Sequence, residues 1–157
     1  MAKFRYRMQN ILNMKLSMEE QAKMQYAAAN SRLAAEEEKL LQLRNRKAAY
    51  ESEAKKLLTQ TLNVRDIMSN NKGLRMIEEE IKAQILQVHT ARMNAEKARE
   101  RLTGEMQERK MHERLKEKAF EEFMQEEKQN ESKEIDELTS YTYGQRIAGN
   151  KEKDQVV

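Results

Sequence analysis

The chain has 157 residues, of which 36% are charged, and its 30 basic and 27 acidic side chains leave a formal net charge of only +3. Its mean hydropathy of −1.02 lies far below that of ordinary globular domains, which excludes a large compact core. Proline is absent, glycine occurs four times, and good helix formers fill the remainder, so the composition predicts an all-α protein.

Cysteine is absent, which excludes disulfides and thiolate metal sites. The basic start MAKFRYRMQNILNMKL has no continuous apolar core of the kind found in signal peptides. No stretch approaches the roughly twenty apolar residues that a membrane span requires. We therefore expect a cytoplasmic protein with no direct membrane insertion.

The first predicted helix covers about residues 4–68. From Tyr26 onward, apolar residues recur at alternating spacings of three and four, which is typical of the a and d positions of a coiled coil. The members of this first seam are Tyr26, Ala29, Leu33, Leu40, Leu43, Tyr50, Ala54, Leu57, Val64 and Met68. Polar residues interrupt it at Glu36, Lys47 and Thr61.

The segment SNNKG, residues 69–73, has the Asn and Gly content that ends helices, so it predicts a turn there. A second seam follows in a helix predicted over about residues 74–139. Its members are Leu74, Ile77, Ile81, Gln84, Val88, Ala91, Ala95, Ala98 and Leu102. The predicted fold is a long antiparallel two-helix coiled-coil hairpin over residues 1–140, followed by a frayed, flexible tail over residues 141–157.

A turn centred near Asn71 would place residue i opposite about residue 142 minus i, so residues 1–18 would face about residues 124–141. The first eighteen residues hold four cations and no acid, whereas residues 120–138 hold eight acids and two lysines. The opposite charges predict that the two ends pair, which would set register more than stability because exposed ion pairs are weak.

The chain offers little for catalysis. Neither histidine, His89 or His112, has a second histidine or a cysteine at a ligand spacing, and no phosphate-binding loop or nucleophile motif occurs. Two packed helices form no concave site. We therefore expect no catalytic residues, no metal, no cofactor and no enzymatic activity.

Nucleic-acid binding is disfavoured even though the isoelectric point is near 9.0, because the cations are interleaved with acids and no basic region precedes strong leucine heptads. A generic coiled-coil scaffold or a self-associating dimer is the alternative reading of the helical pattern. The eleven methionines favour a surface that exchanges partners, although most of them also fit ordinary seam packing.

Both ends of the chain carry recognisable patterns. The opening FRYRMQNILNMKLSMEEQAKMQYAAANSRL, residues 4–33, has alternating aromatic and basic residues followed by an EEQAK pattern, and it resembles the start of the flagellar export protein FliJ family. The closing ERLKEKAFEEFMQEEKQNESKEIDEL, residues 113–138, is similar to its end. The resemblance covers about residues 4–140.

The resemblance implies a non-enzymatic stalk and adaptor of the flagellar type III export apparatus, similar in fold to the coiled coil of the rotary ATP synthase gamma subunit. Such a monomeric stalk would occupy the pore of the hexameric ATPase FliI, promote ring assembly and ATPase activity, reach the export gate FlhA and assist export chaperones. It would lie in the cytoplasm, peripherally associated with the export apparatus at the inner face of the cell membrane.

The resemblance also implies two sets of contact residues. The candidates for ATPase binding are Phe4, Arg5, Tyr6, Arg7, Glu127, Glu131, Asp136 and Glu137. The candidates for gate binding are Leu43, Tyr50, Ile77 and Gln84. Packing at the hairpin end is the alternative role for Phe4 and Ile135, and seam packing is the alternative for Leu43 and Ile77. Gly73 and Arg46 stand where some family members carry an aromatic residue.

Overall fold

The structure of the protein is a computed structural model that describes residues 2–155. It consists of two α-helices, α1 (Gln9–Thr59) and α2 (Val64–Gln155), and contains no strand within the described residues. The predicted all-α two-helix hairpin is confirmed. The chain divides into two units, one made of Met1–Asn13 and Lys110–Val157 and the other of Met14–Arg109.

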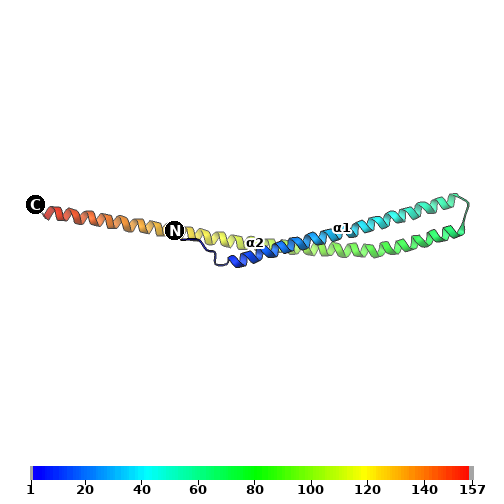
Figure 1. Ribbon diagram of the computed structural model, residues 1–157, viewed down its shortest axis with the longest axis horizontal. Coiled ribbons are helices and arrows are strands. Elements are labelled where there is room, and N and C mark those ends of the chain that lie inside the picture. The colour runs from blue at the N-terminus through cyan, green and yellow to red at the C-terminus, as the bar shows by residue number, and fades with distance from the viewer. Residues whose placement is uncertain (1, 156–157) are drawn as a thin grey trace. The chain divides into compact units, whose positions relative to one another are not determined.

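In the unit Met14–Arg109, the two helices run antiparallel side by side and are joined by a loop at one end (Figure 1). Both predicted seams lie between the helices. Every apolar member from Tyr26 to Leu57 and every member from Leu74 to Leu102 is buried or half-buried. The deepest apolar side chains of this unit are Ala22, Ile77, Val88, Ala91 and Ala95. Alanine dominates here because small side chains let two helix backbones approach closely.

The predicted turn at residues 69–73 is wrong, since α2 runs through this segment and the chain reverses at residues 60–63. Asn63 begins α2 as its N-cap, because its side-chain Oδ1 accepts a hydrogen bond of 3.1 Å from the backbone N–H of Arg65. Asp66 adds a negative charge in the first turn, where the helix dipole favours it. Val64 and Met68, predicted as seam members, are exposed.

The Asn and Gly of the supposed turn serve the packing of the helices instead. Asn70 is buried in the seam and donates a hydrogen bond of 3.2 Å to the backbone carbonyl of Tyr50. Gly73 lies under the Tyr50 ring so closely that an added Cβ would come within 2.7 Å of the ring's Cε1 atom. Neither Gly73 nor any other described residue has a positive φ. Gly73 is therefore a site of close approach and not a turn residue.

Moving the turn changes the register but not the faces that meet. Pairs that bond across the helices, such as Lys15 with Glu108, Glu36 with Gln84 and Lys47 with Glu78, have residue numbers that add to between 120 and 125, whereas the prediction required about 142. The difference of about 18 residues equals five turns of an α-helix. The same stripe of each helix consequently faces its partner in both registers.

In the other unit, α1 begins at Gln9, and residues 2–6 form a non-helical segment instead of the predicted helix from residue 4. This segment is held by aromatic packing, because the Phe4 ring meets Phe120 edge-on at a centroid distance of 5.2 Å and Phe123 at 5.4 Å. A short turn, closed by a hydrogen bond from the Gln9 amide to the Tyr6 carbonyl, leads into α1.

The predicted tail over residues 141–157 differs as well, because α2 continues to Gln155. The segment contains no proline, and local bonds one turn apart support the helix. Thr139 and Thr142 donate to the carbonyls of Ile135 and Leu138 at 2.8 Å, and the Gln145 amide donates to the Tyr141 hydroxyl at 2.9 Å. The last two positions of the predicted tail, residues 156 and 157, lie outside the described residues.

A pair of proline substitutions tests the position of the turn. Asn71→Pro should lower the free energy of unfolding by about 3 kcal/mol, because residue 71 lies inside α2. Thr61→Pro should change it by less than about 1 kcal/mol, because residue 61 lies in the loop. Urea unfolding followed by circular dichroism measures both. The opposite order would return the turn to residues 69–73.

Candidate partner-binding sites

The amino-terminal candidates for ATPase binding divide into two packed aromatic rings and two free cations. Phe4 and Tyr6 are half-buried, and the Tyr6 hydroxyl is buried with no hydrogen-bond partner among the described residues. Arg5 and Arg7 are exposed. The rings therefore fix the segment against α2, while the two guanidinium groups are available to a partner.

The acidic candidates are not brought to the basic segment. Because Phe4 packs at Phe120 and Phe123, residues 131–137 lie further along α2, and every described side chain from Lys128 to Lys153 is exposed. Glu127 alone of the acidic candidates is half-buried. No ion pair among the described residues joins Arg5 or Arg7 to this acidic run. The predicted charge pairing of the two ends is wrong, since it depended on the wrong register.

The structure places all four candidates for gate binding along the seam. Ile77 is only 2% exposed, and Leu43 is half-buried. Tyr50 is half-buried over Gly73, and Gln84 bonds across the helices. Leu43, Tyr50 and Gln84 are each half-buried and so remain partly accessible, whereas Ile77 does not.

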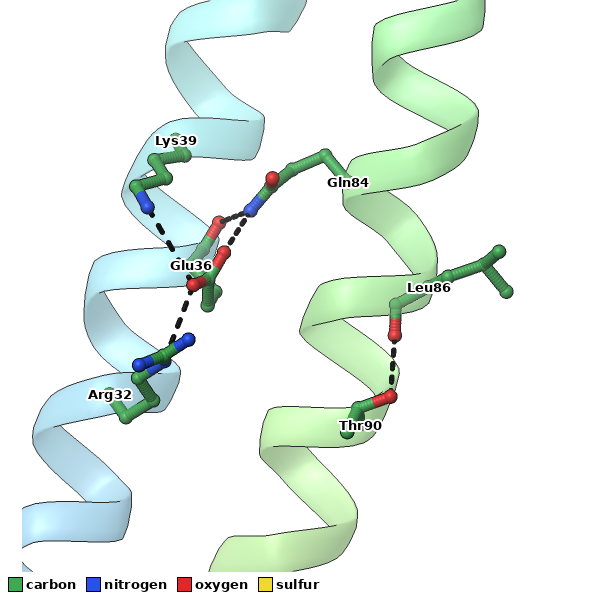
Figure 2. A network of polar contacts seen from close by, with 6 residues as sticks. All are labelled: Arg32, Glu36, Lys39, Gln84, Leu86 and Thr90. Carbon is green, nitrogen blue, oxygen red and sulfur yellow. Dashed lines mark hydrogen bonds and ion pairs between the residues drawn. The ribbon is translucent and has the colours of Figure 1, made fainter.

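Gln84 belongs to a polar layer built around Glu36, which is almost fully buried in the seam. Figure 2 shows the Gln84 side chain of α2 reaching Glu36 of α1. Its amide nitrogen donates to the Glu36 carboxylate at 2.5 Å and to the Glu36 backbone carbonyl at 2.9 Å. Arg32 and Lys39 flank the same carboxylate from α1 at 3.4 and 3.7 Å.

These contacts lower the pKa of Glu36 below its ordinary value of 4.5. The hydrogen bond from Gln84 is the largest cause, burial opposes it, and the charges of Lys39 and Arg32 add to it. A buried carboxylate that has a donor from the opposite helix at one position only is well suited to fix the register of the two helices.

A second polar layer of the same unit is made of full charges. Lys15 of α1 contacts the Glu108 carboxylate of α2 at 2.5 Å, and Glu19, which is buried, forms ion pairs with Arg109 and, at 3.7 Å, with Lys23. Glu108 raises the pKa of Lys15, chiefly through this hydrogen bond and against the opposing effect of burial. Sequence reasoning missed this layer, although Lys15, Glu19 and Arg109 continue the heptad spacing of the two seams.

Residues 2–155 hold no cluster of three or more side chains suited to bind a metal ion. In the part of the chain that the structure describes, neither helix contains a stretch apolar enough to cross a membrane.

The fold and its seam define the class of the protein, which is an antiparallel coiled-coil hairpin. Within that class, the family model described as flagellar FliJ protein matches residues 4–148. The chain belongs to the FliJ family and is accordingly a component of the flagellar export apparatus. Searches of curated proteins and of solved structures gave no match.

The pKa direction of Glu36 predicts how stability depends on pH. The folded pKa lies below the unfolded value of 4.5, so the stabilisation is present above pH 4.5 and is lost as the pH falls through the folded pKa. Between pH 6 and 3, thermal unfolding followed by circular dichroism should show a smaller loss of stability in Glu36→Gln than in the wild type. Glu20→Gln, at an exposed position of α1, is the matched control and should follow the wild type. Equal slopes for Glu36→Gln and the wild type would contradict the role given to the layer.

Proposed function

We propose that this chain is the central stalk and adaptor of the flagellar type III export apparatus. In this role it promotes the assembly and activity of the hexameric ATPase FliI, links the ATPase to the export gate FlhA and assists export chaperones. It acts as a monomer in the cytoplasm, associated peripherally with the apparatus at the inner face of the cell membrane. The observation that carries the proposal is the family match over residues 4–148.

The distribution of charge supports a binding role for the unit made of Met1–Asn13 and Lys110–Val157. Arg5 and Arg7 form no ion pair among the described residues, and the acidic residues Glu131, Asp136 and Glu137 are exposed. Unpaired charges on a fixed scaffold accelerate association with a complementary surface and determine its orientation. The ATPase ring would therefore contact two surfaces of this chain that carry opposite charge.

Charge reversal tests the basic surface. Arg5→Glu combined with Arg7→Glu should reduce the stimulation of purified FliI about fivefold or more, because attraction at two positions becomes repulsion. The matched control is Arg44→Glu combined with Lys97→Glu, two exposed cations of the other unit, which should stimulate as the wild type does. The measurement is the rate of ATP hydrolysis with and without each variant.

The outcomes separate the assignment from the function. Full stimulation by the Arg5→Glu, Arg7→Glu variant would show that the basic surface is wrongly assigned. A wild-type chain that fails to stimulate FliI, together with a dimer in light scattering, would favour the alternative of a self-associating scaffold without an ATPase partner.

The gate candidates call for a test that separates binding from packing. Ile77→Ala should lower the free energy of unfolding by about 2–5 kcal/mol, because Ile77 is buried, and should leave FlhA binding by the folded fraction intact. Tyr50→Ala removes a ring with an exposed edge and should weaken FlhA binding about fivefold or more. Titration calorimetry with purified FlhA, at a temperature where both variants are folded, measures the difference. Equal binding by Tyr50→Ala and the wild type would remove Tyr50 from the gate site.

A further inference from the structure

The end of the hairpin at the α1–α2 loop carries four exposed aliphatic side chains that have no role in the seam. We call this end the hairpin tip, and its aliphatic side chains are Leu58, Leu62, Val64 and Met68. Each is 65–69% exposed, although aliphatic groups of this size are costly to leave in water. All four lie in or within five residues of the loop at residues 60–63, which joins α1 and α2 at one end of the unit Met14–Arg109 (Figure 1).

Five cations flank the tip on the adjoining ends of α1 and α2. Residues 54–76 hold one acid, Asp66, and the cations Lys55, Lys56, Arg65, Lys72 and Arg75. All five cations are exposed, and none takes part in an ion pair among the described residues. Along the rest of the hairpin, cations such as Lys15, Lys47 and Arg92 are paired with acids of the opposite helix. The tip therefore has an excess positive charge that the chain itself does not neutralise.

The two kinds of side chain are arranged in layers. On α1, Lys55 and Lys56 precede Leu58 by two to three residues, which at 1.5 Å per residue places them about 3–4.5 Å behind it. On α2, Lys72 follows Met68 by four residues, about 6 Å further from the loop. The aliphatic side chains are thus outermost on both helices, and most of the cations lie behind them.

We propose that the hairpin tip binds peripherally to the surface of an anionic lipid bilayer. An anionic bilayer has the same order of layers as the tip, since apolar side chains reach about 5–10 Å into the boundary between headgroups and acyl chains while Lys and Arg remain at the phosphates. Arg65, which lies among the aliphatic residues, has a side chain long enough to extend back to the headgroups. The inference goes beyond the proposed stalk function.

Charge complementarity favours a lipid surface over an acidic protein groove. The cations come from both helices, Lys55 and Lys56 from α1 and Arg65, Lys72 and Arg75 from α2, so they flank the aliphatic residues from two sides instead of lining one helix. A flat anionic surface contacts all of them at once, whereas a groove would contact the cations of one side. Each basic residue near an anionic surface contributes about fivefold in affinity at moderate salt.

The experiment uses the full chain and vesicles of phosphatidylcholine with or without phosphatidylglycerol, separated by flotation. The wild type should bind the anionic vesicles and not the neutral ones, and binding should weaken as salt is added. Leu62→Glu combined with Val64→Glu should weaken binding at least tenfold. Leu86→Glu, at an equally exposed aliphatic position outside the tip, should bind as the wild type does.

The cations are tested in the same assay. Lys55→Glu combined with Lys56→Glu should weaken binding at least tenfold and flatten the dependence on salt. Arg44→Glu combined with Lys97→Glu makes the same change of charge outside the tip and should have a much smaller effect. Equal losses in both pairs would mean that net charge alone drives binding, and that result would overturn the tip as the site.

Fluorescence gives a second measurement, because the chain contains no tryptophan. The emission of Leu62→Trp should shift to shorter wavelength on adding anionic vesicles, and that of Leu86→Trp should not. If the wild type does not bind anionic vesicles while Leu62→Glu with Val64→Glu loses binding to purified FlhA, the occupant is a protein surface and the proposal is overturned. Neither vesicle measurement involves the ATPase, so failure here leaves the stalk function to its own tests.

Discussion

The single seam between α1 and α2 is the constraint on which the structure depends. Two helices can bury only one stripe each, and this stripe is rich in alanine and polar residues, so burial alone does not select one register. A slip of five turns would keep the stripes together but would set Glu36 against Leu102 and the Tyr50 ring against the Cβ of Ala91 in place of Gly73. The first leaves a buried carboxylate without its donor, and the second creates a clash. Polar pairing and one glycine therefore select the register of the two helices, which the burial of apolar residues does not.

The same reasoning explains which parts of the fold could be predicted from the sequence. The helical class and the faces of both helices follow from heptad spacing, which a five-turn error does not disturb. The turn could not be recognised from its composition, because Asn70 and Gly73 have the chemistry of a turn and are used for a cross-helix hydrogen bond and a ring contact. The sequence did contain a signal for the true turn: Asn63 is followed three residues later by Asp66, which is the pattern of a helix start.

The candidate sites were less predictable than the fold because their geometry depends on register. With the helices five turns out of place, the acidic residues of α2 were expected to lie against Arg5 and Arg7, whereas the Phe4 contacts hold the basic segment near Phe120 and Phe123. The surroundings of the gate candidates depend on the register as well. Spacing alone did not reveal that Gln84 is committed to Glu36, because a hydrogen bond between helices requires knowing which residues face each other.

The charge that the chain leaves unpaired is unevenly distributed, and this connects the structure to its family role. In the middle of the hairpin, cations meet acids across the seam, so these charges are satisfied within the chain. At the hairpin tip and along residues 128–153 they are exposed and contribute nothing to the seam. A segment whose residues do not stabilise the fold is free to have its charge set by what it binds. We propose that partner selection by this member of the family rests on these surfaces, because charge governs the rate and orientation of association more than its final strength.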